Sequence, residues 1–512
     1  MFRNYLILPV LALLLVASCS RTQISSEGDI TLATPERMSK AAINEFVLQQ
    51  LQQKQVFKWE TASVDLVWSA ISWGNDIAAI GYQPAGFSNI EDKMHEIDIT
   101  TPAWRNVRQD LIDFVLHETQ KYFPNDNITE EKLLMGHPVE EVLPNFNILI
   151  KHPAIVEALR NRTDVRYVEP MNYTMEEVAD RSDSGCDVTP NYNIPSADYT
   201  TTSPAVKIPW NFHLLNIPTA WSTSQGNNIG VCLIDTGTSP NQPKLGSQFA
   251  SGQSTGRYIS RYGTYVSSWW WWASPDGPDD DCGHGTQMAG LISAPRASGG
   301  SSVGVAYKAD LIAYRATGDV IVNSSNEKNG VKDALVAAGN RSDVKIISMS
   351  IGDVFYSSTV ADGIFYAYNK GKLIFAAAGT SLSWTSWWGV IFPANMSQTV
   401  AVTGVKEGFP LVRCNTCHDG SEVDFIVPMQ RRNDDSRTSL TLAMSGDVPA
   451  YVGGSSAATA TTAGIAALVW ATNPGQSRTQ ILNRLKNAAS IYPGRDGNFG
   501  WGIIDAQYAV TH

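Results

Sequence analysis

The most constraining feature of this 512-residue sequence is an uninterrupted apolar run, residues 229–234, that leads directly into Asp235. The run reads Ile-Gly-Val-Cys-Leu-Ile and lacks the polar alternation of a half-exposed strand, so it predicts a strand buried on both faces. Thr236-Gly237 follows as a turn signal, which places the Asp235 carboxylate at the carboxyl end of the strand. Strands of this kind belong to α/β domains, whose functional sites lie at this end of the sheet.

Two further segments contain the residue types that would complete a nucleophilic triad with Asp235. His284 lies in Cys-Gly-His-Gly-Thr, residues 282–286, and Ser456 lies in Gly-Gly-Ser-Ser-Ala-Ala, residues 453–458. Each precedes small and apolar residues at helical spacing, so a helix is expected to begin at each. A serine hydroxyl is a poor nucleophile near neutral pH. It needs an imidazole to take its proton and a carboxylate to orient that imidazole.

These three segments, in this chain order, resemble the subtilisin-like serine peptidases. The resemblance spans residues 205–512 and includes further matching stretches at 304–315, 346–352, 372–379, 399–405 and 500–506. It implies an α/β fold, a three-layer domain with a mostly parallel central sheet. It also implies a serine endopeptidase that hydrolyses exported or envelope polypeptides through an acyl-enzyme, with Asp235, His284 and Ser456 as the catalytic residues.

The same resemblance implies which residues contact the substrate. Ser350 and Gly352 are expected to pair with the substrate backbone, and Ala378 and Gly379 to contact it before the oxyanion position. The family usually has an asparagine at that position, where this chain has Thr380. A threonine hydroxyl is a shorter donor, so we expect a weaker or differently built oxyanion hole. The alternative is a catalytically weak or inactive lipoprotein that uses the same fold as a binding module.

The amino-terminal residues predict export. Arg3 precedes an apolar run over residues 5–16, which is too short to span a membrane but has the length of a signal-peptide core. Residues 16–19, Val-Ala-Ser-Cys, resemble a bacterial lipobox, which implies a signal peptide at 1–18 and a lipid on Cys19. We therefore expect a membrane-anchored lipoprotein of the bacterial cell envelope, in the outer membrane or periplasm, unless maturation releases it. A plain secretory signal with an incidental cysteine is the alternative.

Residues 19–182 predict a smaller α+β region ahead of the triad-bearing domain. Helices are expected near residues 40–53, 104–122 and 153–160, strands at 142–150 and 165–170, and a hairpin across 64–82. The last strand–helix–strand resembles the end of the inhibitory propeptides of the family, which implies that this zymogen's own prodomain is a partner. A permanent accessory domain is the alternative. Residues 183–204, rich in Ser, Thr, Pro and Asn, predict a linker in which maturation cleavage falls.

Charge and cysteine content limit the remaining ligands. The net charge of −11, with a pI near 5.3 and no evident basic patch, excludes nucleic acid as an expected partner. Cys414-x-x-Cys417-His418 matches a haem-attachment pattern, but a local disulfide or a pair of structural thiols is favoured. Cys186 and Cys282 could pair, and Cys232 is expected to be a buried thiol.

Two remaining features carry no assigned ligand. Tryptophans at 269–272 and at 384, 387 and 388 could form an aromatic wall, although mutual packing is favoured. The spacing of the aspartates at 276 and 279–281 matches no known calcium-binding loop, so they are interpreted as a solvated turn. No metal site is predicted and no cofactor is expected to be required, while calcium stays open without assigned ligands.

Overall fold

The structure is a computed structural model that describes residues 35–54, 56–135, 142–175, 185–186, 190–268, 273–380 and 389–512. The chain divides into Met1–Pro35 and a compact unit, Glu36–His512, and all that follows concerns the second. The expected signal peptide, Cys19 and both groups of tryptophans lie outside the described residues. None of the described helices is both long and apolar enough to cross a membrane.

The N-terminal region, residues 36–175, is built on a three-stranded antiparallel sheet with the order β2-β1-β3. Its strands are β1 (Ile77–Tyr82), β2 (Asn145–Leu149) and β3 (Val165–Pro170). Its helices are α1 (Lys40–Lys54), α2 (Val64–Trp73), α3 (Ile90–Lys93), α4 (Pro102–Tyr122), α5 (Glu130–Leu133) and α6 (Pro153–Arg160). The helices expected near 40–53, 104–122 and 153–160 are confirmed, as is the strand at 165–170.

The predicted hairpin across residues 64–82 is wrong, because its first half is helix α2. Ser63 caps this helix by accepting a hydrogen bond from the Leu66 N–H at 3.3 Å. Residues 66–71 are all buried, a continuous run without the alternation of a half-exposed hairpin strand. The turn at Asn75 and Asp76, both with positive φ, therefore ends a helix and starts β1 instead of joining two strands.

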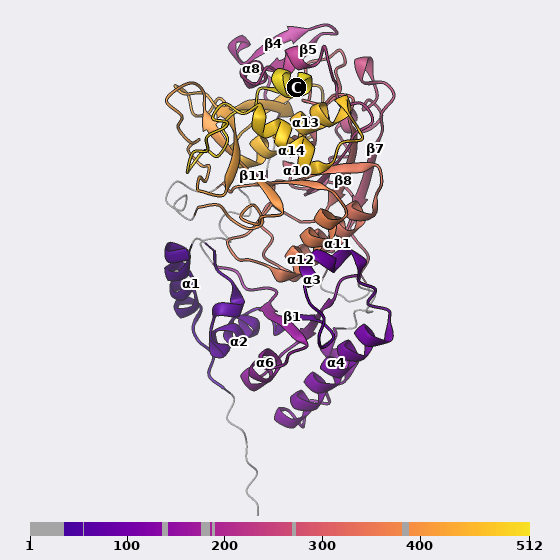
Figure 1. Cartoon of the computed structure of the whole chain (residues 1–512), viewed down its shortest axis with the longest axis vertical. Coiled ribbons are helices and arrows are strands. Elements are labelled where there is room, and N and C mark those ends of the chain that lie inside the picture. Colours follow the sequence, from indigo (N-terminus) through magenta and orange to yellow (C-terminus); the bar gives the residue numbers. More distant parts are fainter. Residues whose placement is uncertain are drawn as a thin grey trace, which may run out of the picture. The chain divides into compact units, whose positions relative to one another are not determined.

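The C-terminal region, residues 190–512, contains a seven-stranded sheet with the order β12-β11-β10-β9-β6-β8-β7, and every neighbouring pair in it is parallel (Figure 1). Its strands are β6 (Gly230–Asp235), β7 (Ile259–Gly263), β8 (Asp310–Arg315), β9 (Val344–Met349), β10 (Leu373–Ala377), β11 (Thr399–Lys406) and β12 (Val423–Gln430). Two short hairpins complete the strands: β4 (Tyr199–Thr202) with β5 (Val206–Pro209), and β13 (Ser439–Leu442) with β14 (Pro449–Val452).

Helices cover both faces of the sheet, as the continuous apolar run at 229–234 predicts. Val231 and Leu233 of β6 join the core formed with α10 (His284–Ser293) and α13 (Gly454–Thr472). Cys232 and Ile234 face the other side and join the core formed with α11 (Ser325–Asn340) and α12 (Ser358–Asn369). The remaining helices are α8 (Trp210–Leu214), α9 (Ile217–Ala220), α14 (Arg478–Asn487) and α15 (Ala506–Thr511). The result is a three-layer α/β domain.

Part of the expected linker is built into the C-terminal region. Asp198 is fully buried, and its carboxylate accepts hydrogen bonds from Arg431, Arg437 and the Tyr451 hydroxyl. The β4–β5 hairpin follows immediately. Residues from about 190 onward are therefore held on the domain by buried charge pairs.

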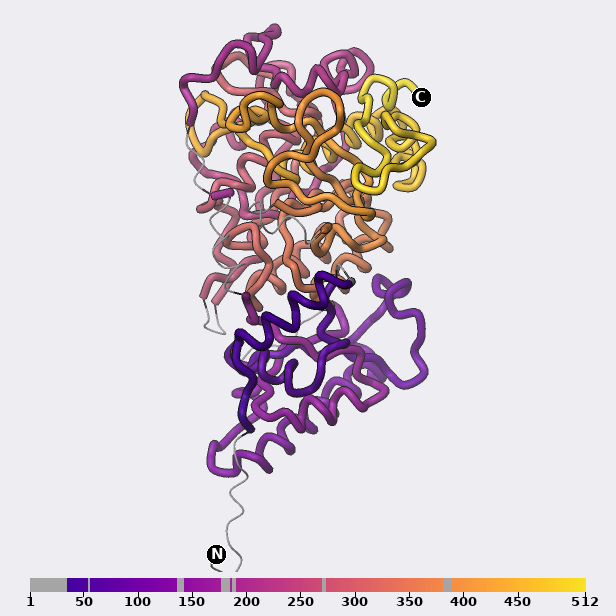
Figure 2. Tube along the Cα trace, turned by 90° about the vertical axis from the view of Figure 1, so that its left-hand side faces the viewer, coloured from indigo at the N-terminus to yellow at the C-terminus, as the bar shows by residue number. Residues whose placement is uncertain are grey.

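Buried polar groups join the two regions of the compact unit, whose chain is traced from indigo to yellow in Figure 2. The Asp362 carboxylate on α12 accepts hydrogen bonds from Arg166 at 3.0 and 2.6 Å, from the Tyr167 hydroxyl at 2.9 Å and from Asn145 at 3.0 Å. Glu169 accepts from the Ser358 N–H at 2.8 Å, at the start of α12. The N-terminal region thus meets the C-terminal region through specific, largely desolvated contacts.

Candidate active site

Asp235 lies at the carboxyl end of the central strand β6, where the sequence predicts it. Its side chain is fully buried. Its Oδ1 accepts a hydrogen bond from the Thr236 N–H at 2.8 Å and lies 2.7 Å from His284 Nδ1. A short contact to Nδ1 from a buried carboxylate fixes the ring orientation and favours the tautomer that carries its proton on Nδ1. Asp235 and His284 therefore form an oriented carboxylate–imidazole pair.

His284 is the first residue of α10, and the loop before it is organised by a residue that the sequence interpretation missed. Asp280 was expected to belong to a solvated turn, yet it is 3% exposed. Its carboxylate accepts hydrogen bonds from the backbone N–H groups of Cys282, Gly283 and Thr286, and from the Thr236 and Thr286 hydroxyls. Burial nevertheless raises the pKa of Asp280 above its ordinary value. This carboxylate ties the β6 turn to the start of α10.

The His284 imidazole is shielded from solvent and electrostatically biased. Burial by itself favours the neutral ring, but the charge and hydrogen bond of Asp235, together with the charge of Asp280, outweigh burial and raise the pKa of His284 above 6.5. The side chain is only 5% exposed. A ring with this bias is suited to hold a proton taken from a neighbouring hydroxyl.

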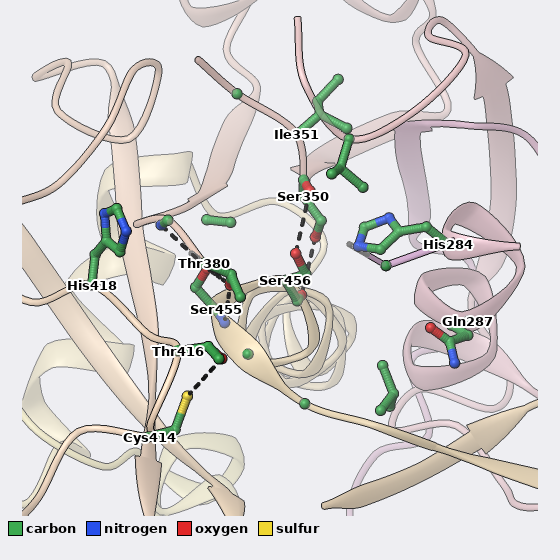
Figure 3. Close-up of a pocket in the computed structure, with 18 of the residues that line it drawn as sticks. His284, Gln287, Ser350, Ile351, Thr380, Cys414, Thr416, His418, Ser455 and Ser456 are labelled. Atoms are coloured by element: carbon green, nitrogen blue, oxygen red, sulfur yellow. Dashed lines mark hydrogen bonds between the residues drawn. The ribbon is translucent and has the colours of Figure 1, made fainter. Parts of the chain in front are cut away.

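Ser456 lies in the first turn of α13, after Gly453 and Gly454. The Ser456 hydroxyl donates to the Ser350 carbonyl at 3.3 Å, and the Ser350 hydroxyl donates to the Ser456 carbonyl at 3.0 Å. Figure 3 shows the His284 ring beside this serine pair, and all three residues line one cavity of about 560 Å³. The structure thus brings the three predicted triad residues together from β6, α10 and α13.

Thr380 reaches the residue before the candidate nucleophile. Its hydroxyl accepts the Ser455 N–H at 3.0 Å and lies 2.8 Å from the Ser455 hydroxyl, with which it shares a hydrogen bond. Ser455 is fully buried, and its hydroxyl also accepts the Gly379 N–H at 3.2 Å. The Thr380 oxygen is therefore engaged with the nucleophile segment, which limits its freedom to donate elsewhere.

The residues expected to contact substrate differ in which backbone N–H and carbonyl groups are free to pair with a substrate. Ala378 is buried, its N–H donates to Val402 and its carbonyl accepts from Ile391. Gly379 has φ +126° and packs against the His418 ring, which would lie 2.6 Å from a Cβ at this position. Gly379 therefore forms part of the cavity wall, whereas Ala378 lies behind it and its backbone has no group left for an incoming strand.

Gly352 is likewise engaged. Its N–H donates to the Val320 carbonyl at 3.1 Å, and its carbonyl accepts the Val322 N–H at 3.0 Å. Backbone pairing with a substrate at this residue would require that bridge to open. Local sequence could not predict this, because the pairing joins residues about 30 positions apart along the chain.

The cysteines form two disulfides, Cys186–Cys282 and Cys414–Cys417, and Cys232 stays a buried free thiol. The favoured alternative at 414–417, a local disulfide, is thus the one found, and it leaves no thiol there for haem attachment. His418 is directed to the Gly389 carbonyl, 2.7 Å from its Nδ1. Within the described ranges, no group of three His, Cys, Asp or Glu side chains has the arrangement of a metal site.

Comparisons with known proteins agree with this architecture. A family described as the subtilase family matches residues 226–502. The chain is 29% identical over 360 residues to the minor extracellular protease Epr of Bacillus subtilis (strain 168), covering 70% of this chain but only 48% of Epr. It is 26% identical to the M-protease of Shouchella clausii (strain KSM-K16), covering 74% of this chain and 92% of that protein.

A solved structure supports the fold over a longer stretch. Fervidolysin from Fervidobacterium pennivorans, described as a keratinolytic enzyme related to subtilisin, superposes with a TM-score of 0.57 at 18% identity. The likeness covers 85% of this chain and 61% of fervidolysin. At 18% identity, this likeness supports only the arrangement of the helices and strands.

Proposed function

This chain belongs to the subtilase family, and on that premise we propose that it is a serine endopeptidase made as an exported zymogen. The observation that carries the proposal is the 2.7 Å contact between the buried Asp235 and His284, whose side chain lines one cavity with Ser456 at the start of α13. The substrate would be a polypeptide, as for the relatives that are proteases.

The proposed reaction uses the three residues in sequence. His284 takes the Ser456 hydroxyl proton while the serine oxygen attacks the peptide carbonyl, and Asp235 stabilises the imidazolium. His284 then protonates the leaving amine, which gives an acyl-enzyme, and water attacks that ester by the same proton route. The negative oxygen of each tetrahedral intermediate would be held by the Ser456 N–H at the helix end, with Thr380 as a secondary donor.

The resting hydrogen bond from Ser456 to Ser350 is compatible with this route. A hydroxyl rotates about a single bond, and catalytic hydrogen bonds often tighten only when substrate is bound. The raised pKa of His284 supports its role as the base, because a more basic ring accepts the serine proton more readily.

The proposal extends to the N-terminal half. The buried contacts of Asp362 and Glu169 support an N-terminal region that folds against the C-terminal domain, as a prodomain would. Cleavage near residues 183–204 would mature the enzyme, and a lipid on Cys19 would anchor the unprocessed chain in a bacterial envelope. Calcium binding stays without assigned ligands, and nucleic acid is not proposed as a partner.

A fluorophosphonate probe, which reacts with activated serines, tests the catalytic proposal. We expect covalent labelling of the processed protein and none of Ser456→Ala. Self-processing is tested by the same variant, which should remain full length in the native host. The alternative is a binding module, favoured by the engagement of the Thr380 hydroxyl and the Gly352 backbone. If correctly processed protein and Thr380→Asn both fail to label, the alternative replaces the peptidase proposal.

A further inference from the structure

The edge of the cavity at Gly352 is covered by another segment of the chain. Residues 320–322 run beside Gly352, forming a bridge between Ile321 and Gly352. The Gly352 N–H and carbonyl are both used by this bridge, through Val320 at 3.1 Å and Val322 at 3.0 Å. Beyond Ser350, the edge that could receive a peptide strand is therefore already paired.

A second element lies against the same place. We call Gly185 and Cys186 the strap, since the Cys186–Cys282 disulfide holds them two residues before His284. A Cβ on Gly185 would lie 3.2 Å from His284 Cδ2 and 3.6 Å from Val320 Cγ1. Gly185 also has φ +131°, which a residue with a side chain rarely adopts. The strap thus lies beside both the candidate base and residues 320–322, with too little space for a side chain at position 185.

The position of these elements indicates which half of a substrate they affect. A peptide bond attacked by Ser456 must lie near Ser350, whose carbonyl the Ser456 hydroxyl contacts. In an antiparallel pairing, the commoner kind, residues on the acyl side of that bond run toward Gly352. In Figure 3, Ile351 and Thr416 lie on opposite sides of Ser456, so the leaving-group side extends toward Thr416.

Resting on the peptidase function proposed above, we propose that the strap and residues 320–322 close the acyl side of the cleft beyond Ser350. The enzyme then recognises polypeptides by the scissile residue and by residues on the leaving-group side. Substrate residues further from the scissile bond on the acyl side turn away from the protein and form no backbone hydrogen bonds with the Gly352 edge. Because the strap is bonded to Cys282, the closure persists whether maturation cleaves the chain before or after the strap within residues 183–204.

Two peptide series on the matured, oxidised enzyme test this inference. One series lengthens the acyl side from one to four residues, and the other lengthens the leaving-group side over the same range. We expect kcat/KM to change less than about threefold in the first series and to rise about tenfold or more in the second. An open edge offering two backbone hydrogen bonds would instead give about tenfold on the acyl side.

Because the strap packs beside Val320, the proposal has it holding residues 320–322 against Gly352. The Cys186→Ser/Cys282→Ser double variant releases the strap, so the bridge to Gly352 should open and the enzyme should gain an acyl-length dependence of about tenfold. Cys232→Ala, which alters a buried cysteine away from the cleft, is the matched control and should keep the flat response. Reduction of the wild type with tris(2-carboxyethyl)phosphine gives a second route to a free strap if the double variant does not fold. Because reduction also opens Cys414–Cys417, the Cys414→Ser/Cys417→Ser variant is its control and should keep the flat acyl-side response.

Three results would overturn the inference. They are a tenfold acyl-side gain in the oxidised wild type, a flat response once the strap is free, and an oxidised enzyme that cuts no peptide until it is reduced. Fluorophosphonate labelling of the same samples distinguishes failure of this inference from failure of the proposed peptidase function. If the peptidase function itself is wrong, Ser456 will not be labelled in any sample, oxidised or reduced.

Discussion

Removal of the Asp362 carboxylate should loosen the attachment of the N-terminal region to the C-terminal domain. Asp362 is 1% exposed, and Arg166, Tyr167 and Asn145 all donate to it. In Asp362→Ala the Arg166 guanidinium, 12% exposed, would stay buried without its partner. Breaking one side of such a pair costs about 3–5 kcal/mol. At about 1.4 kcal/mol per decade, this favours local separation by a factor of about 10² to 4 × 10³.

Hydrogen exchange by mass spectrometry measures this effect in the full-length Ser456→Ala chain, which would not process itself. The reporting amides are those of Tyr356, which donates to the Phe57 carbonyl, and of Ser358, which donates to Glu169. Their protection should fall by a factor of about 10² to 4 × 10³ in Asp362→Ala. Glu157→Gln, on the exposed face of α6, is the control and should leave protection unchanged.

A compensating variant separates loss of the ion pair from general damage. Asp362→Leu with Arg166→Met removes both charges at once, and an apolar pair of similar volume is often tolerated in place of a buried ion pair. We expect this double variant to regain most of the protection lost in Asp362→Ala. The reasoning is refuted if Asp362→Ala alters protection less than threefold, or if the double variant loses more than the single one.

Three further outcomes are expected. The acid limb of kcat/KM should lie above pH 6.5, because Asp235 raises the pKa of His284 and the ring must be neutral to accept a proton; a limb at or below 6.5 contradicts this. Burial raises the pKa of Glu169 from 4.5 to about 7, so the folded state holds a proton that the unfolded state has lost. Stability in urea should then fall by about 3 kcal/mol from pH 4.5 to above 7, and Glu169→Gln should flatten this slope. Thr380→Asn should raise kcat about tenfold or more with little change in KM. The Thr380 hydroxyl is already engaged with Ser455, and one oxyanion donor is worth about 10²–10³ in kcat. An unchanged kcat contradicts this.

The parts of this molecule that could be predicted are those with local signals. An apolar run without alternation identified β6, because a strand buried on both faces needs no polar positions. The turn after Asp235 and the small residues after Ser456 placed two candidate residues at element boundaries for the same reason. The parallel sheet places the carboxyl ends of its strands at one edge. There Asp235 after β6 contacts His284 of α10, and Ser350 after β9 contacts Ser456 of α13.

The features that escaped prediction depend on partners far away along the chain. Asp280 lies in a run of acids that is typical of a solvated turn, and only the closed loop supplies its five donors. The Asp362–Arg166 pair joins residues 196 positions apart. The pairing of Gly352 with Val320 and Val322 likewise uses backbone groups whose availability no side-chain pattern reveals.

The cysteines show how burial resolves an ambiguity that counting leaves open. Five cysteines follow Cys19, so one must stay unpaired within the chain, and any of them could be that one. Cys232 faces the core shared with α11 and α12, and burial raises the pKa of its thiol far above the ordinary range. Since disulfide exchange proceeds through the thiolate, Cys232 is both inaccessible and unreactive in the folded chain. In an oxidising compartment the other four can then settle into Cys186–Cys282 and Cys414–Cys417 without competition. The strap's bond to Cys282 is in this way protected by the same strand that presents Asp235.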